Sequence, residues 1–472
     1  MNNCVFESAA PESVGINSRR IINFIKSLED CRIDMHSILI LKDRKLICEA
    51  YYAPFKRDSL HRMFSVTKSL VSVAIGILLD KGAINLDESI TRYFPEYKPK
   101  DGFHPFLVET TIRDMLKMTT PHNGTTFDKH VLNDWTESYF TKEPTHRPGT
   151  VFSYDTSASH VLTALIEKLT KMSLLDFLRE NGFTKIGFSD EAYCMRDGAG
   201  VSQGGSGLMA YPMDLLAVAD MVMNKGQAQN LQIVSHEYIS EAVSYQVSNF
   251  VKGSFIEEMQ GYGYQFWRIR NNGFMIYGMA GQLAVCLPDK NMILVTTADT
   301  TDRKDGMQLI FESFWHELYD YIGEDLDSES KYDSLLRLCE NLEVKPLKSE
   351  TAREFNQTFE FGLNNLGLNK LRIVTGGSCG KVILESVHGN QKIEFGFNSM
   401  RRGVFSHYSC PYAASGAWVD KDVLVVKANL IGECIGKVIM QFSLSKPGAV
   451  TVFSRKTEQV LFTEYSGFAQ SV

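Results

Sequence analysis

The sequence lacks any excess of positive charge. Its 472 residues include 49 lysines and arginines against 56 aspartates and glutamates, which gives a formal net charge of −7. No cluster of basic residues forms the footprint that a phosphate backbone requires. We therefore expect no nucleic-acid partner, and an acidic, solvated surface is the simpler interpretation.

Long apolar runs are also missing. The longest, LVSVAIGILL from Leu70 to Leu79, is about half of the roughly 20 residues that cross a bilayer. The first residues, MNNCVFESAAPESVGINSRR, do not place an apolar segment after a basic one, as a signal peptide would. We expect no membrane span and a cytoplasmic location.

Patterns typical of metal ligands are absent. The nine cysteines contain no C-x-x-C pair, and the eleven histidines contain no H-x-x-x-H pair or neighbouring cluster of carboxylates. We therefore predict no metal site and no cofactor, and we expect the cysteines to be reduced, mostly buried thiols.

The patterns that are present predict an α+β domain over residues 1–323. Apolar residues at helical spacing predict a helix over 18–30, and residues 36–53 read as two strands around a charged turn. Residues 85–245 are mostly helical, 261–299 return to strands, and 306–323 form an amphipathic helix. Strands at both ends of a helical middle favour one antiparallel sheet.

The remaining sequence differs in character. Residues 324–350 are polar and charged, which indicates a linker. Residues 351–472 alternate strand-like runs with turns and predict a small all-β sandwich or barrel. The strand-like runs are KLRIVT, KVILESV, QKIEFGF, DVLVVKANL, KVIMQFSLS, AVTVFSR and QVLFTEY.

The pattern S-x-x-K occurs four times, and one occurrence opens a long apolar helix. There, Ser65 and Lys68 share a helix face, so the amine can reach the hydroxyl. The helix N-terminus favours a developing alkoxide, and a desolvated lysine can act as a base. The alternative is a helix-capping serine beside a lysine that reaches to solvent. The other matches are Ser328/Lys331, Ser378/Lys381 and Ser443/Lys446.

Tyr154 stands between a Pro148-Gly149 turn and a second apolar helix. A phenol at such a junction can face a cleft and shuttle a proton between a serine and a lysine. The alternative is a core tyrosine followed by a capping residue, Asp155 or Thr156.

Taken together, Ser65-Val66-Thr67-Lys68, Tyr154-Asp155-Thr156 and a late glycine-rich strand resemble the serine β-lactamase-related family. This family includes class C β-lactamases, penicillin-binding-protein-type peptidases, esterases and amidases. The flanking segments follow the family's order over roughly residues 10–322. The resemblance implies a β-lactamase/transpeptidase-like domain, with a sheet flanked by helices and a helical subdomain, and an appended C-terminal β domain.

The resemblance also implies the roles of the site residues. Ser65 would be the acylated nucleophile, Lys68 its base and Tyr154 the proton shuttle. The Ser65 backbone N–H and a second N–H near Met279 would stabilise the oxyanion. The implied oxyanion and substrate-binding residues are Ser65, Thr156, Tyr277, Gly278 and Met279.

Two departures from the family limit the expected substrate. Thr156 replaces the usual asparagine of the second motif, and the strand from Ile276 to Gln282 lacks the usual Lys-Thr-Gly or His-x-Gly. No cation stands there for the carboxylate of a penicillin. We therefore expect a small-molecule ester or amide substrate. The alternatives are an acylation-only or non-catalytic sensor, an acyltransferase, or a true β-lactamase or DD-peptidase.

Three further features have a structural interpretation. The glycine-rich run at 204–207 predicts a tight turn that lines the cleft, and His61 and His160 are expected to be structural. Several aromatic residues either line an acyl pocket or belong to the core. These are Trp135, Tyr139, Phe140, Tyr264, Phe266 and Trp267.

Overall fold

A computed structural model describes residues 6–128, 131, 133–324, 329–350, 353–446 and 448–472. The chain divides into two compact units. The first unit contains residues 1–298 and 305–342, and the second contains 299–304 and 343–472. Ser328, from one of the S-x-x-K matches, lies outside the described residues.

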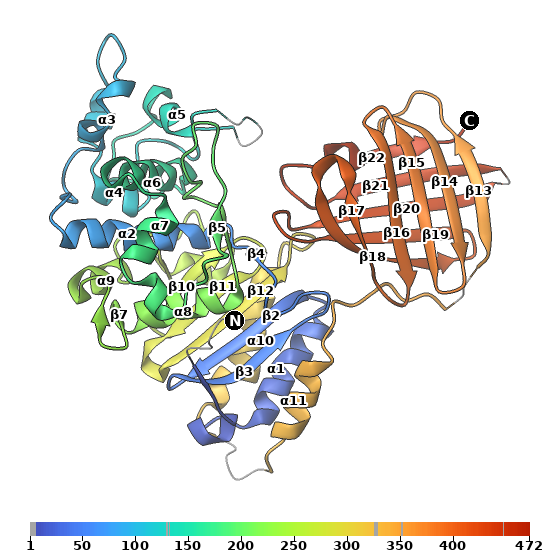
Figure 1. Ribbon diagram of the computed structural model, residues 1–472, viewed down its shortest axis with the longest axis horizontal. Coiled ribbons are helices and arrows are strands. Elements are labelled where there is room, and N and C mark those ends of the chain that lie inside the picture. The colour runs from blue at the N-terminus through green and yellow to red at the C-terminus, as the bar shows by residue number, and fades with distance from the viewer. Residues whose placement is uncertain (1–5, 129–130, 132, 325–328, 351–352, 447) are drawn as a thin grey trace. The chain divides into compact units, whose positions relative to one another are not determined.

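The first unit is built on a sheet with the strand order β1-β3-β2-β12-β11-β10-β9 (Figure 1). β2 and β3 form the predicted hairpin, because Asp43 and Arg44 both adopt the positive φ of a two-residue turn. β9 to β12 pair antiparallel in sequence order, whereas the short β1 pairs with β3 in parallel. The strands are β1 Glu7–Ser8, β2 Asp34–Lys42, β3 Lys45–Tyr51, β9 Trp267–Arg268, β10 Phe274–Gly278, β11 Gln282–Leu287 and β12 Met292–Asp299.

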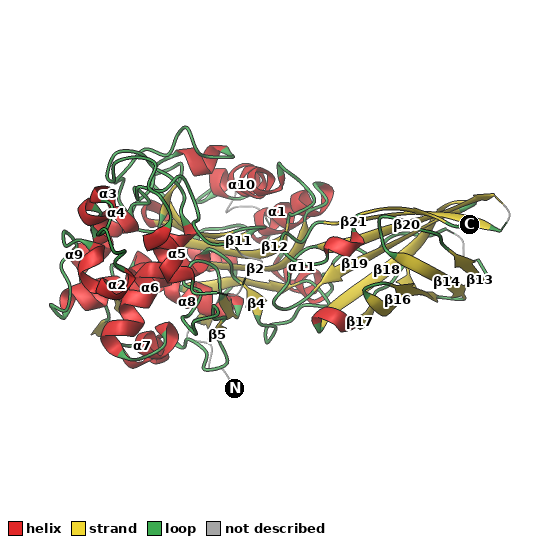
Figure 2. Cartoon of the chain, turned by 90° about the horizontal axis from the view of Figure 1, so that it is seen from above, coloured by secondary structure: helices red, strands yellow, loops and turns green. Residues whose placement is uncertain are grey.

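Helices cover both faces of this sheet. Figure 2 shows α1 and α10 on one face and α8 on the other. α2 is buried from Val66 to Leu78, which makes it the central helix of the helical region and explains its nearly uniform apolar sequence. The helices are α1 Ser18–Asp30, α2 Val66–Asp80, α3 Pro105–Glu109, α4 Ile112–Leu116, α5 Trp135–Thr141, α6 Thr156–Thr170, α7 Leu174–Glu180, α8 Pro212–Met223, α9 His236–Ala242, α10 Gly306–Glu317 and α11 Tyr332–Glu340.

Two small sheets complete the first unit. In one of them, β6 pairs with both β4 and β5, and this pairing fixes the backbone just before Ser65. The strands of these sheets are β4 His61–Arg62, β5 Tyr193–Cys194, β6 Leu208–Ala210, β7 Gln227–Ala228 and β8 Leu231–Gln232. No helix in the described part of the chain is long and apolar enough to cross a membrane.

Helix α11 lies inside segment 324–350, for which the sequence predicts a linker. The helix packs against α1 and β3 and buries Leu335, so the first unit extends to Leu342. The sequence predicts a linker here because α11 is short and mostly polar, and only one narrow apolar stripe packs against the rest of the unit.

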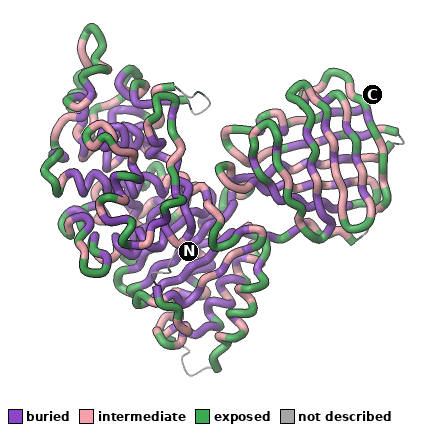
Figure 3. The backbone as a smooth tube through the Cα atoms, in the orientation of Figure 1, coloured by how far each residue is buried: buried purple, intermediate pink, exposed green. Residues whose placement is uncertain are grey.

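The second unit is a barrel rather than a sandwich. Its main strand order runs β13-β14-β15-β16-β18-β19-β20-β21-β22, and β17 pairs with β18. A bridge between Phe361 and Ser471 joins the two ends of this order and closes the sheet. Figure 3 shows buried and exposed residues alternating along the strands, as expected for a filled interior. The strands are β13 Phe355–Glu360, β14 Leu368–Gly376, β15 Cys379–Ser386, β16 Gly389–Phe397, β17 Arg401–Phe405, β18 Cys410–Asp420, β19 Val423–Leu430, β20 Lys437–Lys446, β21 Ala449–Lys456 and β22 Gly467–Gln470.

The structure corrects one predicted strand and adds others. The run QVLFTEY forms no strand; it turns at Phe462, whose φ is 63°, into a 3-10 helix over Thr463–Tyr465. β18 was not predicted, because its alanine, serine and glycine residues carry little strand propensity. Its neighbours on both sides supply the pairing that holds it.

Candidate active site

Ser65 stands at the entrance to α2. The preceding residue, Phe64, adopts a φ of 48°, which is uncommon for a bulky side chain and turns the chain sharply from β4 into the helix. Ser65 occupies the N-cap position, yet its side chain makes no capping hydrogen bond. Its hydroxyl is therefore available to the site, and the helix-cap interpretation does not hold.

Lys68 is buried one turn into the same helix, with an exposed fraction of 1%. Its Nζ donates to the Ser65 hydroxyl at 3.1 Å, to the Gly205 carbonyl at 2.6 Å and to the Thr156 hydroxyl at 3.4 Å. The lysine thus points into the protein rather than to solvent. The i, i+3 spacing brings the amine to the serine, as the helical pattern predicts.

Tyr154 approaches the same serine from the residue before the N-cap of α6. That N-cap, Asp155, accepts from the Ser157 N–H at 2.8 Å and from the Thr120 hydroxyl at 3.0 Å, which fixes the start of the helix. The Tyr154 ring centre lies 4.9 Å from the Lys68 Nζ. Burial raises the pKa of Tyr154 well above its usual value, although a hydrogen bond with Ser65 lowers it in part. The phenol therefore enters the site in its neutral form.

The end of β10 forms the facing wall. Gly278 must be glycine, because a Cβ there would lie 2.1 Å from the Met63 carbonyl oxygen. The turn that follows carries Met279, and the buried Gln282 amide holds it by donating to the Met279 carbonyl at 2.7 Å and the Ala298 carbonyl at 3.1 Å. Among the described residues, the structure shows no acceptor for the backbone N–H of Ser65 or of Met279.

Gly205 belongs to the glycine-rich run, which forms the predicted tight turn. A Cβ on Gly205 would lie 2.2 Å from the Thr156 methyl group and 3.5 Å from the Lys68 Nζ. Only glycine lets this backbone approach closely enough for its carbonyl to accept from Lys68. The sequence places the turn in the cleft but does not reveal this contact.

These elements enclose a cavity of about 340 Å³, referred to below as the Ser65 pocket. Predicted residues that line it are Ser65, Tyr154, Thr156, Tyr277 and Met279; Lys68 is bonded to Ser65, and Gly278 packs against Met63. Part of the lining could not be predicted from the sequence, because loop residues carry no periodic signal. The residues missed are Thr125, Phe152, Lys252, Ser254 and Glu258.

Except for Trp267, the remaining candidates lie in the protein interior, away from the Ser65 pocket. His61 is buried and its Nε2 lies 2.7 Å from the Nδ1 of His36, while the His160 Nε2 lies 3.0 Å from an Asp197 oxygen. Burial lowers the pKa of His61 to about 4. Of the aromatic candidates, Trp267 lines the Ser65 pocket. The others belong to the buried core: Trp135, Tyr139, Phe140, Tyr264 and Phe266.

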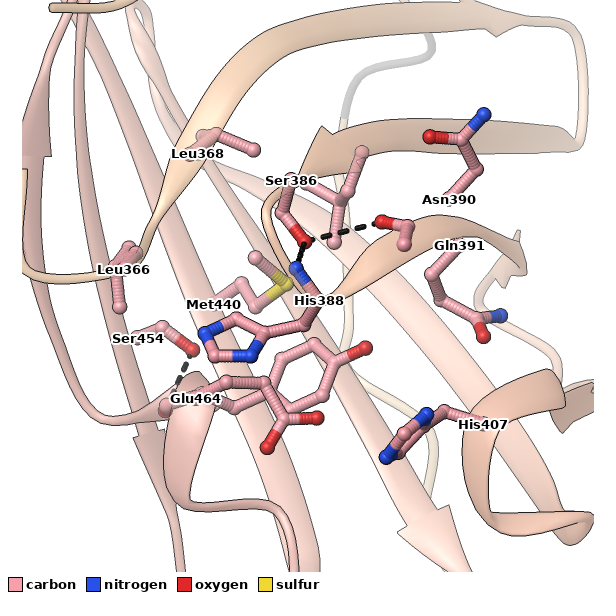
Figure 4. A pocket seen from close by; sticks show the side chains of 13 residues that line it. Leu366, Leu368, Ser386, His388, Asn390, Gln391, His407, Met440, Ser454 and Glu464 are labelled. Atoms are coloured by element: carbon pink, nitrogen blue, oxygen red, sulfur yellow. Dashed lines mark hydrogen bonds between the residues drawn. The ribbon is translucent and has the colours of Figure 1, made fainter.

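A second, much smaller cavity lies in the barrel (Figure 4). Its volume of about 40 Å³ is little more than the space of one water molecule in the liquid. The lining mixes apolar residues such as Leu384 and Met440 with His388, His407 and Glu464. Within the described residues, no group of three or more potential metal ligands occurs here or elsewhere.

The fold and the Ser65 pocket define a β-lactamase/transpeptidase-like protein: a sheet covered by helices on both faces, with a serine–lysine–tyrosine cluster between the sheet edge and a helical region. The profile of the Beta-lactamase family matches residues 23–310, and the chain belongs to this family. The resemblance drawn from the sequence is thereby confirmed.

Curated relatives are distant and match in part. The chain is 22% identical to a 6-aminohexanoate-dimer hydrolase of Paenarthrobacter ureafaciens over 242 residues, which are 48% of this chain and 60% of that protein. It is 38% identical to Esterase EstB of Burkholderia gladioli over 69 residues, 14% of this chain and 17% of the esterase. The chain thus spans less than two thirds of the length of these relatives. Their names and the family support a hydrolase.

Solved structures support the fold alone. A putative β-lactamase from Bacteroides dorei superposes with a TM-score of 0.54 at 17% identity, over 64% of this chain and 98% of that one. A structure titled SurE covers 98% of this chain and 99% of its own, with a TM-score of 0.51 and 14% identity. The combination of both units therefore has a structural counterpart.

Proposed function

We propose that this protein is a serine hydrolase that cleaves an ester or amide through an acyl-enzyme on Ser65. The observation that supports the proposal most strongly is the hydrogen bond from the buried Lys68 Nζ to the Ser65 hydroxyl, 3.1 Å long. Serine is a weak nucleophile on its own and needs an adjacent base within hydrogen-bond reach.

In the acylation step, Lys68 acts as a neutral amine: its Nζ accepts the Ser65 hydroxyl proton across the 3.1 Å contact while the Ser65 oxygen attacks the substrate carbonyl carbon. Burial disfavours a charged amine in general, which suits this role. The tetrahedral oxyanion then receives hydrogen bonds from the Ser65 and Met279 N–H groups, which are without acceptors among the described residues.

Collapse of the intermediate expels the leaving group, which takes a proton from the Tyr154 hydroxyl, and the phenol is reprotonated from Lys68. Tyr154 can relay this proton because it is neutral, hydrogen-bonded to Ser65 and beside the lysine. Water then attacks the acyl-enzyme by the reverse route, which releases the acid and restores Ser65.

The substrate proposal follows from what replaces the usual third motif. The segment from Ile276 to Gln282 contains no lysine or histidine, whereas related enzymes carry in this motif the cation that binds a substrate carboxylate. Ester and amide cleavage needs the nucleophile, base and oxyanion donors, none of which depends on that cation. We therefore propose an esterase or amidase rather than a β-lactamase.

The test compares steady hydrolysis of p-nitrophenyl butyrate by the wild type and by Ser65→Ala. We expect turnover by the wild type and a loss of at least about a thousandfold in the variant. A fluorophosphonate probe should label Ser65 in the wild type, as peptide mass spectrometry would show. A single burst of one equivalent without steady turnover would instead indicate an acylation-only sensor, and unchanged hydrolysis by Ser65→Ala would refute the proposal.

A further inference from the structure

Aromatic rings gather on one side of the Ser65 pocket around Trp267. The Trp267 ring centre lies 5.3 Å from that of Tyr154, 5.8 Å from that of Tyr277 and 6.0 Å from that of Phe152. All four residues line the pocket. The rings meet Trp267 at tilted or edge-on angles, so they form a bent wall rather than a flat stack.

A carboxylate adjoins this wall. Glu258 lies in a 3-10 helix, Ile256–Met259, and lines the same pocket although the residue is only 8% exposed. Its Oε2 accepts from the Ser254 N–H at 2.7 Å. Burial raises the pKa of Glu258, while hydrogen bonds with Ser254 and Tyr277 lower it in part.

The preceding residue shows what is unusual about Glu258. Glu257 is fully buried, and its carboxylate accepts from the Arg270 Nε at 2.6 Å and from the Trp315 Nε1 at 3.0 Å. The protein thus supplies a cation for Glu257. For Glu258 the described residues contain no ion pair, although burying a carboxylate without a cation is costly.

We infer that the Glu258 carboxylate and the aromatic wall around Trp267 form a subsite for a cationic, alkylammonium substituent of the substrate. This inference rests on the proposed function, because the bound group belongs to the substrate. Aromatic faces attract ammonium groups, most strongly where water is excluded, and a nearby carboxylate neutralises the bound charge. Met279 adds no cation at the end of β10. Two lysines oppose the bound charge: Lys68, whose Nζ lies 4.9 Å from the Tyr154 ring centre, and Lys252, exposed in the lining.

Binding of a charge-matched pair tests the subsite without any catalysis. Choline and its neutral carbon isostere, 3,3-dimethylbutan-1-ol, have the same shape and differ in charge. We expect isothermal titration calorimetry on the full-length Ser65→Ala protein to show choline binding at least about tenfold more tightly than the alcohol. Adding Glu258→Gln should reduce this preference below about threefold. Equal binding of the pair, or a preference that survives Glu258→Gln, would overturn the inference.

Two further variants keep the test decisive. Glu237→Gln removes an exposed carboxylate from α9, outside the pocket, and should keep the full preference. Lys252→Gln removes the opposing charge from an exposed position and should tighten choline binding about two- to threefold. If Glu258→Gln does not unfold cooperatively in a thermal melt, the Lys252 result decides, and an unchanged or weaker affinity for choline then counts against the subsite.

Hydrolysis separates this inference from the proposed function. Butyrylthiocholine and S-(3,3-dimethylbutyl) thiobutyrate release thiols that the same reagent detects. If both are cleaved at equal rates and choline binds no better than its isostere, the hydrolase proposal stands and the cationic subsite is refuted. If neither is cleaved but choline binds preferentially through Glu258, the subsite stands and the hydrolase proposal fails.

Discussion

The same four-residue pattern, S-x-x-K, occurs in both units with opposite results. In the first unit, Ser65 and Lys68 stand on a helix, and the amine donates to the hydroxyl at 3.1 Å. In the second unit, Ser378 lies exposed in a turn, and Lys381 is the third residue of strand β15. Three residues make nearly one turn of a helix, but in a strand they alternate between faces. The pattern therefore acquires chemical meaning only on a helix.

The largest expected effect comes from replacing Lys68, which removes the amine that distinguishes the helical pair from the Ser378/Lys381 pair in the barrel. Lys68→Met should reduce the acylation rate with p-nitrophenyl butyrate at least about a hundredfold, because general-base assistance is lost. Stopped-flow release of p-nitrophenol would measure it. A cooperative thermal melt of the variant controls for folding. An acylation rate within threefold of the wild-type rate would show that Lys68 is not the base.

The second prediction concerns the backbone carbonyl of Gly205, which accepts a hydrogen bond from Lys68. Gly205→Ala should lower kcat about tenfold, since the added methyl group would meet Thr156 at 2.2 Å and displace the carbonyl that accepts from Lys68. Gly362→Ala in the barrel is the matched control, because its Cβ would make one ordinary contact, 3.5 Å from Val472. Equal kcat values for both variants would remove Gly205 from the site.

Burial around the Ser65 helix also predicts a pH dependence of stability. The folded-state pKa of His61 is about 4, against an ordinary value of 6.5, so the unfolded chain binds more protons between these values. The contribution of His61 to stability is complete above pH 6.5 and is lost as the pH falls toward 4. Between pH 7 and 5 this loss amounts to about 2 kcal/mol.

Comparison with His61→Gln measures the contribution of His61 together with that of its hydrogen bond to His36. Asp155 and Asp214, whose pKa values burial raises to about 6, act in the opposite direction, but they do so equally in both proteins. Urea unfolding at pH 7 and pH 5 should show the wild type losing about 2 kcal/mol more than the variant. An identical loss would mean that His61 is not buried as a neutral imidazole.

The sequence reveals the first unit more fully than the second. Two features of the sequence mark the site: the uniformly apolar helix after Ser65 and the tyrosine before a second apolar helix. Both can be recognised because each helix is long enough to show a clear apolar pattern. The structure brings Ser65, Lys68 and Tyr154 together, and their catalytic roles stay predictions. Strand β18 escaped notice because its small residues depend on neighbouring strands for their conformation.

The contacts that shape the pocket could not be predicted. Gly205 and Glu258 lie on irregular segments, and their positions depend on how those segments pack, not on any repeat in the sequence. Nor does the sequence distinguish Glu257 from Glu258: two adjacent acids look alike until Arg270 is seen beside the first alone. Helix α11 was missed for a related reason, since a single buried leucine, Leu335, anchors it.

The smallest expected effect concerns Ser378 and Lys381, one of the two S-x-x-K pairs in the barrel. Ser378→Ala and Lys381→Met should leave p-nitrophenyl butyrate turnover within about twofold of the wild type. Ser378 is exposed, and the described contacts include no bond between the two side chains, so neither residue can activate the other. A tenfold loss in either variant would mean that local secondary structure does not decide which S-x-x-K pair is reactive. Retained turnover would exclude the Ser378/Lys381 pair from the acyl chemistry.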